Sequence, residues 1–207
     1  CTEVAEAGDK LAEAVESWMI ELGLQGCTES TIRTYAYNLR SFLADVPKAL
    51  EDITERDIKM HLARGKTGKM NVRCTRKWSD ATYNLRLRAL RGFFNYCYEY
   101  DLIPENPIKR IKDTKTAHVM QPIMSAEERE MVRSKCHTER EIALVDFLYS
   151  SGVRVSELVS LNRQDIDFRR RRAKCFGKGR KEREITFSAE CGVHLAEYLA
   201  QRTDHNE

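Results

Sequence analysis

An arginine that closely follows a glycine is the residue of this sequence whose setting best suits chemistry. The segment from Leu148 to Leu161 reads LYSSGVRVSELVSL, with Gly152 two positions before Arg154. This pattern predicts a tight turn and then a short helix that begins at Arg154 and presents its guanidinium. Glu157 stands three residues later, so both side chains project from one helix face. A guanidinium held in this way can bind phosphate oxygens; the alternative is an ordinary surface ion pair.

A lysine between two glycines, Lys178, follows later in the chain. The segments on either side of Gly177 and Gly179 alternate apolar and basic residues, which predicts a hairpin with the lysine at its tip. A lysine beside a phosphate is a suitable proton donor, because it is a flexible cation whose pKa responds to its surroundings. Taken alone the GKG pattern is a weak signal, since most such lysines are exposed turn residues.

The composition indicates a folded protein with locally basic segments. The chain has 207 residues, of which 42% are hydrophobic and 32% charged, so one or two packed domains are expected. The net charge is only +3, but residues 64–78 and 169–183 are strongly basic, whereas residues 1–21 are acidic. Basic segments of this kind favour a nucleic-acid partner; solvated loops are the alternative.

Several other classes of protein do not fit the residue pattern. The seven cysteines form no C-x-x-C pair and are expected to be reduced thiols in the cytoplasm. No apolar run of about 18 residues exists to span a membrane, and no signal peptide is visible. Cys136 and His137 are adjacent, which suits joint metal ligation poorly. Because no Walker loop, Ser-His-Asp set or acidic metal cluster stands out either, no metal or cofactor is expected.

Apolar residues at helical spacing predict four helices in the first half of the chain. They lie over residues 11–22, after Thr28, after Thr54 and after Ser79. The T-x-x-D pattern at 54–57 resembles a capping box, and the long last helix stops before Pro104. Residues 64–78 show no helical period and indicate a basic loop.

The second half is expected to combine helices with a small sheet. Residues 109–122 are polar and basic, and they indicate a linker. Helices are predicted after Ser125, from about Glu139, from Arg154 to Leu161 and after Ser188. Alternation from Asp165 to Phe187 predicts an antiparallel sheet with turns at 169–171 and 177–179.

The short helix and the residues before it are expected to pack against the core. Val155, Leu158 and Leu161 are predicted to point inward from the helix that begins at Arg154. Tyr149, which precedes the turn, is predicted to be a core residue.

The arginine and lysine motifs together resemble those of the tyrosine recombinase (phage integrase) family. The first half is similar to the core-binding domain of that family, through the T-x-x-x-Y-x-x-x-L-x-x-F pattern at residues 31–42, the segment 84–94 and the IPENP segment at 103–107. The resemblance implies a mainly α fold with a small antiparallel β-sheet. It assigns residues 1–112 to a helical core-binding (SAM-like) DNA-binding domain, 113–122 to a linker and 123–207 to the first part of an α+β catalytic domain.

The resemblance also implies catalytic roles. Arg154 is the arginine that binds the scissile phosphate, Glu157 supports it, and Lys178 is the general acid toward the leaving 5′-oxygen. The family pattern further requires an H-x-x-R segment, another histidine or tryptophan and a tyrosine nucleophile after the hairpin. The chain ends at Glu207 without them, so a missing segment on the order of 100 residues is expected. Tyr198 does not lie in a nucleophile context.

Contacts to the DNA are expected from polar and basic side chains in both halves. An ordinary solvated helix face is an equally good interpretation of each residue taken alone. The predicted contacts are Ser30, Arg33, Thr34 and Asn38; Arg76, Lys77 and Ser79; Asn84, Arg86, Arg88 and Arg91; and Arg180, Lys181 and Arg183.

The sequence thus predicts site-specific recombination or integration of DNA, by strand breakage and rejoining through a 3′-phosphotyrosine. The resemblance implies double-stranded DNA as partner, a clamp of two domains around the duplex, and a homotetramer on paired sites in the bacterial cytoplasm. Arginine and lysine would hold the charge of the transition state, with no metal. One alternative is a DNA-binding module that competes for recombination sites without cutting. Another is a helical protein–protein scaffold, which would show no salt-dependent affinity for DNA.

Overall fold

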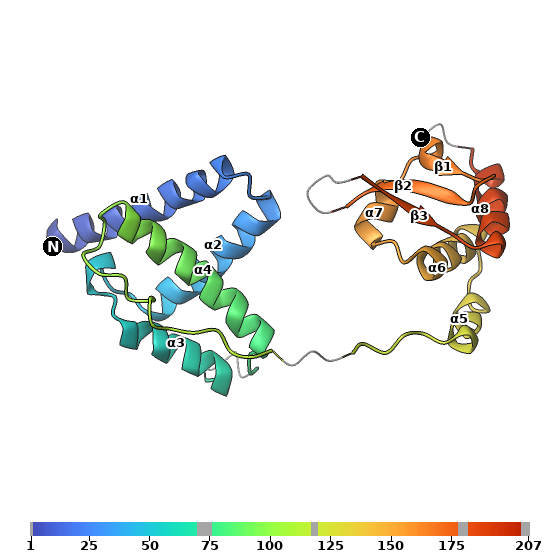
Figure 1. Ribbon diagram of the computed structural model, residues 1–207. Coiled ribbons are helices and arrows are strands. Elements are labelled where there is room, and N and C mark those ends of the chain that lie inside the picture. Colours follow the sequence, from blue (N-terminus) through green and yellow to red (C-terminus); the bar gives the residue numbers. More distant parts are fainter. Residues whose placement is uncertain (1, 70–75, 117–119, 178–181, 204–207) are drawn as a thin grey trace. The chain divides into compact units, whose positions relative to one another are not determined.

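A computed structural model describes residues 2–69, 76–116, 120–177 and 182–203, with side chains from residue 10 on. The chain divides into two compact units, Cys1–Val119 and Met120–Glu207 (Figure 1). This division falls inside the predicted linker, whose bounds at 113 and 122 stay a prediction. The expected fold class is confirmed, since helices dominate and a single three-stranded antiparallel sheet is described.

Four helices and one short 3-10 turn form the first unit. They are α1 (Thr2–Leu24), α2 (Glu29–Asp45), η1 (Leu50–Asp52), α3 (Glu55–Thr67) and α4 (Asp80–Glu99). The hydroxyls of Thr28, Thr54 and Ser79 each accept a backbone N–H in the first turn of the following helix, which is how such residues stabilise a helix start. The predicted capping box at 54–57 is present.

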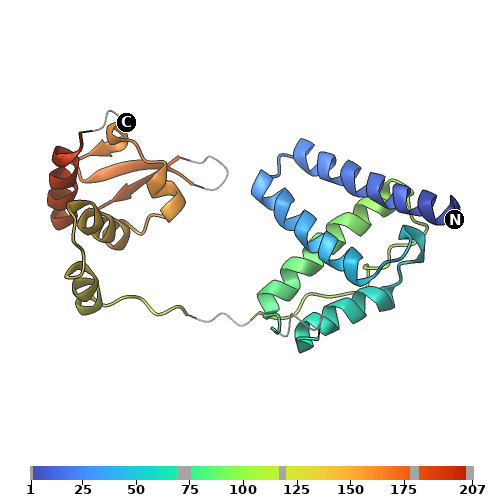
Figure 2. The same ribbon diagram turned by 180° about the vertical axis from the view of Figure 1, so that it is seen from behind.

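Helix α4 is the centre of the first unit. It packs against α1, α2 and α3 (Figures 1 and 2) through an apolar face on which Leu87, Leu90, Phe93, Phe94 and Cys97 are all buried. The Trp18 ring meets Phe93 edge-on at 5.5 Å, and Phe42 meets Phe94 at 6.0 Å. Edge-to-face contacts of this kind add to the free energy of burial.

The basic loop predicted for residues 64–78 begins later than expected, since residues 64–67 belong to α3, and the Trp78 indole packs against that helix. Its ring lies so close to Gly65 that a β-carbon there would come within 2.2 Å of it, and its backbone N–H donates to the Gly65 carbonyl at 3.0 Å. The other partners of the ring are the buried His61 at 5.5 Å and the Arg86 guanidinium at 4.0 Å. Burial lowers the pKa of the His61 imidazole, which favours its neutral form.

Residues 111–116, which include the start of the predicted linker, lie along α4. The Asn84 side chain exchanges hydrogen bonds with the backbone of Thr114, at 2.9 Å in each direction. Arg91 donates to the Ile111 carbonyl at 3.0 Å and to Asp113 at 3.1 Å. These contacts join the first part of the connecting segment to the first unit.

The second unit places a sheet beside helices. Its elements are α5 (Ala126–Arg133), α6 (Glu139–Ser151), α7 (Val155–Val159), η2 (Arg163–Asp165), β1 (Ile166–Asp167), β2 (Arg172–Phe176), β3 (Glu182–Thr186) and α8 (Ala189–Gln201). The strand order is β1-β2-β3, and both pairs are antiparallel. The side chains of Ala173, Cys175 and Ile185 are buried with Phe147 and Phe187 in one cluster, as the alternation of a half-buried sheet requires.

Helix α5 is attached to this unit by charged side chains, and none of its own residues is buried. Arg133 pairs with Glu190 of α8, and its Nη1 lies 3.6 Å from the buried carboxylate of Asp146. Asp146 also contacts His194 Nδ1 at 2.6 Å. Arg129 lies over the Tyr149 ring at 4.9 Å. Tyr149 is 40% exposed, so the prediction that it is a core residue is wrong; it contacts a cation instead.

Replacing Gly65 by alanine tests the contact with Trp78. The added methyl group would overlap the indole ring, and we expect a loss of about 1–3 kcal/mol in the free energy of unfolding, the usual range for overpacking. Gly23 is the matched control, since a β-carbon added there would meet nothing within 4 Å. Gly23→Ala should leave the stability unchanged or raise it by up to about 1 kcal/mol. Urea denaturation measures both; equal stability of the two variants would contradict the packing role of Trp78.

Candidate active site

The turn before Arg154 depends on a left-handed glycine. Gly152 ends α6 with φ 61°, a conformation that glycine adopts without strain. Val153 is buried after it, and Arg154 is extended at the start of α7. The buried Val153 fixes where the backbone of Arg154 lies, and the turn followed by a short helix agrees with the prediction.

Glu157 is the buried centre of this site. Its side chain is only 4% exposed. Oε1 accepts the Arg154 Nη1 at 2.7 Å, and Oε2 accepts the Arg154 backbone N–H at 3.0 Å and the Arg183 Nη2 at 2.7 Å. The backbone N–H of Arg154 and the guanidinium of Arg183 together hold the pKa of Glu157 at about 2. The carboxylate is therefore ionised at neutral pH.

The Arg154 guanidinium is fixed on one side and open on the other. Nη1 is bound to Glu157, while 66% of the side chain is exposed. Among the described residues no other partner of this side chain is seen, so its remaining N–H donors can bind an anion. Leu158 and Leu161 pack against the core as predicted. Val155 is 66% exposed, and the prediction that it points inward is wrong.

Arg183 was predicted to contact DNA, which stays a prediction, and within the chain its guanidinium binds Glu157. It lies on β3, where its register partner on β2 is Cys175. The bond to Glu157 raises the pKa of Arg183. Sequence reasoning missed this pair because the two residues are 26 positions apart; the alternation of β3, which places Arg183 on the same face as the apolar Ile185, was the available signal.

Three predicted site residues, Lys178, Arg180 and Lys181, lie outside the described part of the chain. The strands on either side of them are described, and β2 and β3 remain paired up to Phe176 and Glu182. The predicted roles of these three residues stay predictions.

A groove between α2 and α4 brings several of the predicted DNA contacts together. It has a volume of about 420 Å³, and its lining is formed by Ser30, Arg33, Thr34, Tyr37, Asn38, Thr82, Leu85 and Arg86. Tyr37 is 67% exposed; sequence reasoning did not nominate it, although an exposed aromatic ring among polar residues is a common feature of binding surfaces. The groove is thus the described surface of the first unit that best matches the predicted contacts.

The α2 residues that were predicted to contact DNA also interact with other residues of the chain. Arg33 pairs with Glu29, and the Thr34 hydroxyl donates to the Ser30 carbonyl at 2.8 Å. Asn38 is only 5% exposed, so its access to a partner is limited.

The predicted contacts on and before α4 divide into two groups. Arg76, Lys77 and Arg88 are exposed. The others make contacts within the first unit. Ser79 caps α4, and Asn84 and Arg91 bind residues 111–114. Arg86 lies over Trp78 and donates to Ser41 at 3.1 Å.

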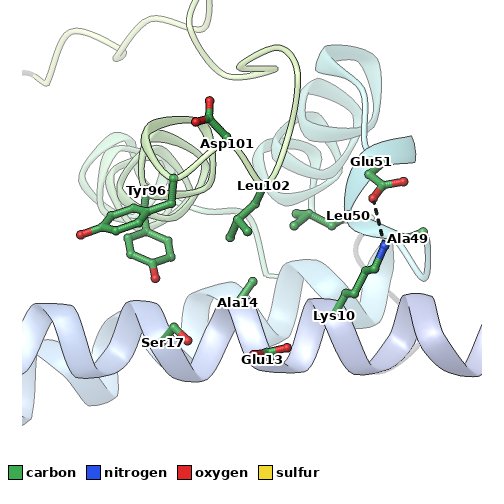
Figure 3. Close-up of a pocket in the computed structure, with 11 residues that line it drawn as sticks. Lys10, Glu13, Ala14, Ser17, Ala49, Leu50, Glu51, Tyr96, Asp101 and Leu102 are labelled. Atoms are coloured by element: carbon green, nitrogen blue, oxygen red, sulfur yellow. Dashed lines mark ion pairs between the residues drawn. The ribbon is translucent and has the colours of Figure 1, made fainter.

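A separate pocket of about 650 Å³ lies in the first unit between α1, η1 and the C-terminal end of α4 (Figure 3). Glu13, Glu51 and Asp101 line it, and the Lys10 ammonium on its wall is 3.9 Å from Glu51. An acidic lining repels phosphate, so this pocket does not fit the chemistry indicated by Arg154. No group of three potential metal ligands occurs among the described residues, and none of the described helices is long and apolar enough to cross a membrane.

Two family models match the chain. The model described as "Phage integrase, N-terminal SAM-like domain" matches residues 15–103, and the model described as "Phage integrase family" matches residues 114–207. The tyrosine recombinase XerC of Treponema denticola is 30% identical over 202 residues, which are 93% of this chain and 64% of that protein. The XerC of Thermodesulfovibrio yellowstonii is 30% identical over 86% of this chain and 58% of that protein. The chain thus spans about three fifths of the length of these relatives.

The fold matches that of solved structures. A crystal structure of a lambda integrase dimer bound to a COC′ core site superposes with a TM-score of 0.69, at 19% identity, over 92% of this chain and 68% of that chain. The match includes both the SAM-like helical unit and the mixed unit that contains Arg154.

The low pKa of Glu157 predicts how the stability depends on pH. Because the folded-state pKa of about 2 lies below the ordinary 4.5, the ionised carboxylate favours the folded state above about pH 4.5, and this advantage is lost as the pH falls toward 2. Glu157→Gln should therefore destabilise the protein most at neutral pH, and the difference from the unchanged chain should narrow below about pH 4.5. Glu184→Gln, which removes an exposed partner of Arg172, should have little effect at any pH. Urea denaturation across this range checks both variants; a difference that does not change with pH would contradict the assignment.

Proposed function

We propose that this chain, which belongs to the phage integrase family of tyrosine recombinases, binds duplex DNA and supplies the first phosphate-binding residues of a site-specific recombinase. One observation carries the proposal: the exposed guanidinium of Arg154 is fixed on one edge by a buried carboxylate and is open on the other. This arrangement supports a role in which the open edge grips a phosphate.

In the proposed reaction Arg154 acts on the charge of the phosphate. Attack on the scissile phosphate develops negative charge on its non-bridging oxygens, and a guanidinium that is already oriented stabilises that charge without reorganisation. Glu157 contributes by holding Arg154 in place. Its own charge is compensated by two arginines, so it does not cancel the attraction of Arg154 for phosphate.

The remaining steps rest on the family resemblance. A tyrosine attacks the phosphate to give a 3′-phosphotyrosine, and Lys178 gives a proton to the leaving 5′-oxygen. The 5′-hydroxyl of a partner strand then reverses the reaction. No nucleophile is assigned within residues 1–207, and the reaction is proposed for an active recombinase that contains this chain. It would act in the bacterial cytoplasm as a homotetramer on paired DNA sites.

Duplex DNA is proposed to contact the groove between α2 and α4 together with exposed basic side chains that precede α4 or lie on it. Arg88, Arg76 and Lys77 are exposed and would bind backbone phosphates. The bonds that Arg33 and Thr34 make within α2 hold their side chains on the surface of the groove.

Binding of this chain to duplex DNA should weaken steeply with salt, because phosphate contacts release counterions. Arg88→Gln should lower the affinity and reduce the slope of log affinity against log salt by about 1. Arg110, which is exposed and lines a pocket with Glu99 and Glu105, is the matched control, and Arg110→Gln should leave the slope unchanged. Fluorescence anisotropy over a range of salt concentrations measures both. An affinity insensitive to salt would favour the protein scaffold, and a covalent protein–DNA product from this chain would show that it carries a nucleophile of its own.

The roles of Arg154 and Lys178 can be separated in an active recombinase that contains this chain. Arg154→Lys keeps the charge but loses the planar fork, and it should slow strand cleavage by about 100-fold or more with DNA binding nearly intact. Lys178→Ala should slow cleavage because the 5′-oxygen leaves without a proton. A 5′-thiolate leaving group needs no proton, so it should restore much of the rate to Lys178→Ala and little to Arg154→Lys. Equal rescue of both variants would refute the separate roles. If the unchanged protein binds DNA but does not cleave it, the result would favour a competing DNA-binding module.

A further inference from the structure

We propose that Arg183 is a positioning residue, which sets the orientation of the Arg154 guanidinium by sharing the Glu157 carboxylate with it. The sequence predicted Arg183 as a contact to the DNA backbone, and this inference replaces that role. It rests on the proposed function of Arg154, and it concerns a residue outside the set that the family resemblance assigns to catalysis.

The two arginines bind different oxygens of the Glu157 carboxylate, and this supports the role. Oε1 accepts the Arg154 guanidinium at 2.7 Å, while Arg183 binds Oε2 at 2.7 Å. The last torsion of a glutamate side chain is broad and has no sharp preference. Without Arg183, Oε2 would keep only the Arg154 backbone N–H at 3.0 Å, and the plane of the carboxylate could rotate. Because Arg154 binds the other oxygen, its guanidinium would turn with that plane.

Arg183 is itself well placed to fix the carboxylate. It lies on β3 two residues before Ile185, which is buried in the core of the second unit, so both side chains leave the strand on one face. Its side chain also contacts the thiol of the buried Cys175 on the neighbouring strand. Arg183 therefore connects the sheet to the α7 turn through a charged hydrogen bond.

An arginine on the neighbouring strand shows what an ordinary pair looks like. Arg172 pairs with Glu184 at 2.6 Å, and their side chains are 49% and 51% exposed. Glu157 is 4% exposed, so its carboxylate is shielded from bulk water and depends on its protein partners. The difference in burial, rather than the distance, separates the positioning role from a surface ion pair.

The first test uses this chain alone and is independent of cleavage. Nuclear magnetic resonance follows the Glu157 carboxyl during an acid titration and the guanidinium signals of Arg154 at neutral pH. Arg183→Gln should raise the pKa of Glu157 from about 2 toward its ordinary value and should shift or broaden the Arg154 signals. Arg172→Gln should change neither. Arg183→Lys keeps the charge and is the second variant, with an intermediate effect expected because an ammonium lacks the planar fork.

The second test uses an active recombinase that contains this chain. Arg183→Gln should slow strand cleavage by about 100-fold, the usual effect of a small misplacement of a reacting group, and should leave the salt dependence of DNA binding unchanged. Adding Arg183→Gln to Arg154→Lys should cause almost no further loss, because both changes remove one arrangement.

The outcomes separate the inference from the proposed function. If Arg183→Gln alters the Arg154 signals but Arg154→Lys cleaves normally, positioning holds and the proposed function fails. If Arg183→Gln leaves the Arg154 signals unchanged, or lowers the salt slope by about 1 as a backbone contact would, positioning is refuted. Independent losses that multiply in the double variant would refute it as well.

Discussion

A carboxylate hidden from water must have its charge compensated, and in this protein that constraint organises the candidate site. Glu157 sits in a helix of five residues, α7, which has too few internal hydrogen bonds to be stable by itself. The carboxylate stabilises the helix start through the Arg154 backbone N–H and reaches β3 through Arg183. The start of α7, the guanidinium of Arg154 and strand β3 therefore all bind to one ionised group.

The two units are stabilised in different ways. In the first, α4 presents an almost continuous aromatic and aliphatic face to three helices, and the aromatic rings meet edge to face. In the second, the apolar cluster is smaller and charged pairs complete the contacts between elements. Charged contacts are more directional than apolar packing, which suits a unit whose candidate site requires a guanidinium in one orientation.

Local signals explain why much of the fold could be predicted from the sequence. Hydroxyl caps at Thr28, Thr54 and Ser79 and the left-handed Gly152 act on neighbouring residues, so they can be recognised in the sequence. The partners of several charged side chains are residues distant in the chain. Arg91 was predicted to face DNA, yet it binds Ile111 and Asp113, and Arg183 binds Glu157. Exposure in a short helix is equally hard to predict, since one turn gives Val155 no repeated spacing from which a buried face can be inferred.

The way in which α5 is attached affects the length of the segment that connects the two units. This helix follows the connecting segment, buries none of its eight residues, and is held by ion pairs such as Arg133 with Glu190, whose side chains are 23% and 42% exposed. Salt screens the exposed part of these pairs and does not weaken an apolar core, so we expect α5 to open more readily than the rest of its unit. Eight residues rise about 12 Å as a helix but extend to about 27 Å when unwound. Opening of α5 would therefore lengthen the connecting segment by about 15 Å. The population of this lengthened form would depend on ionic strength.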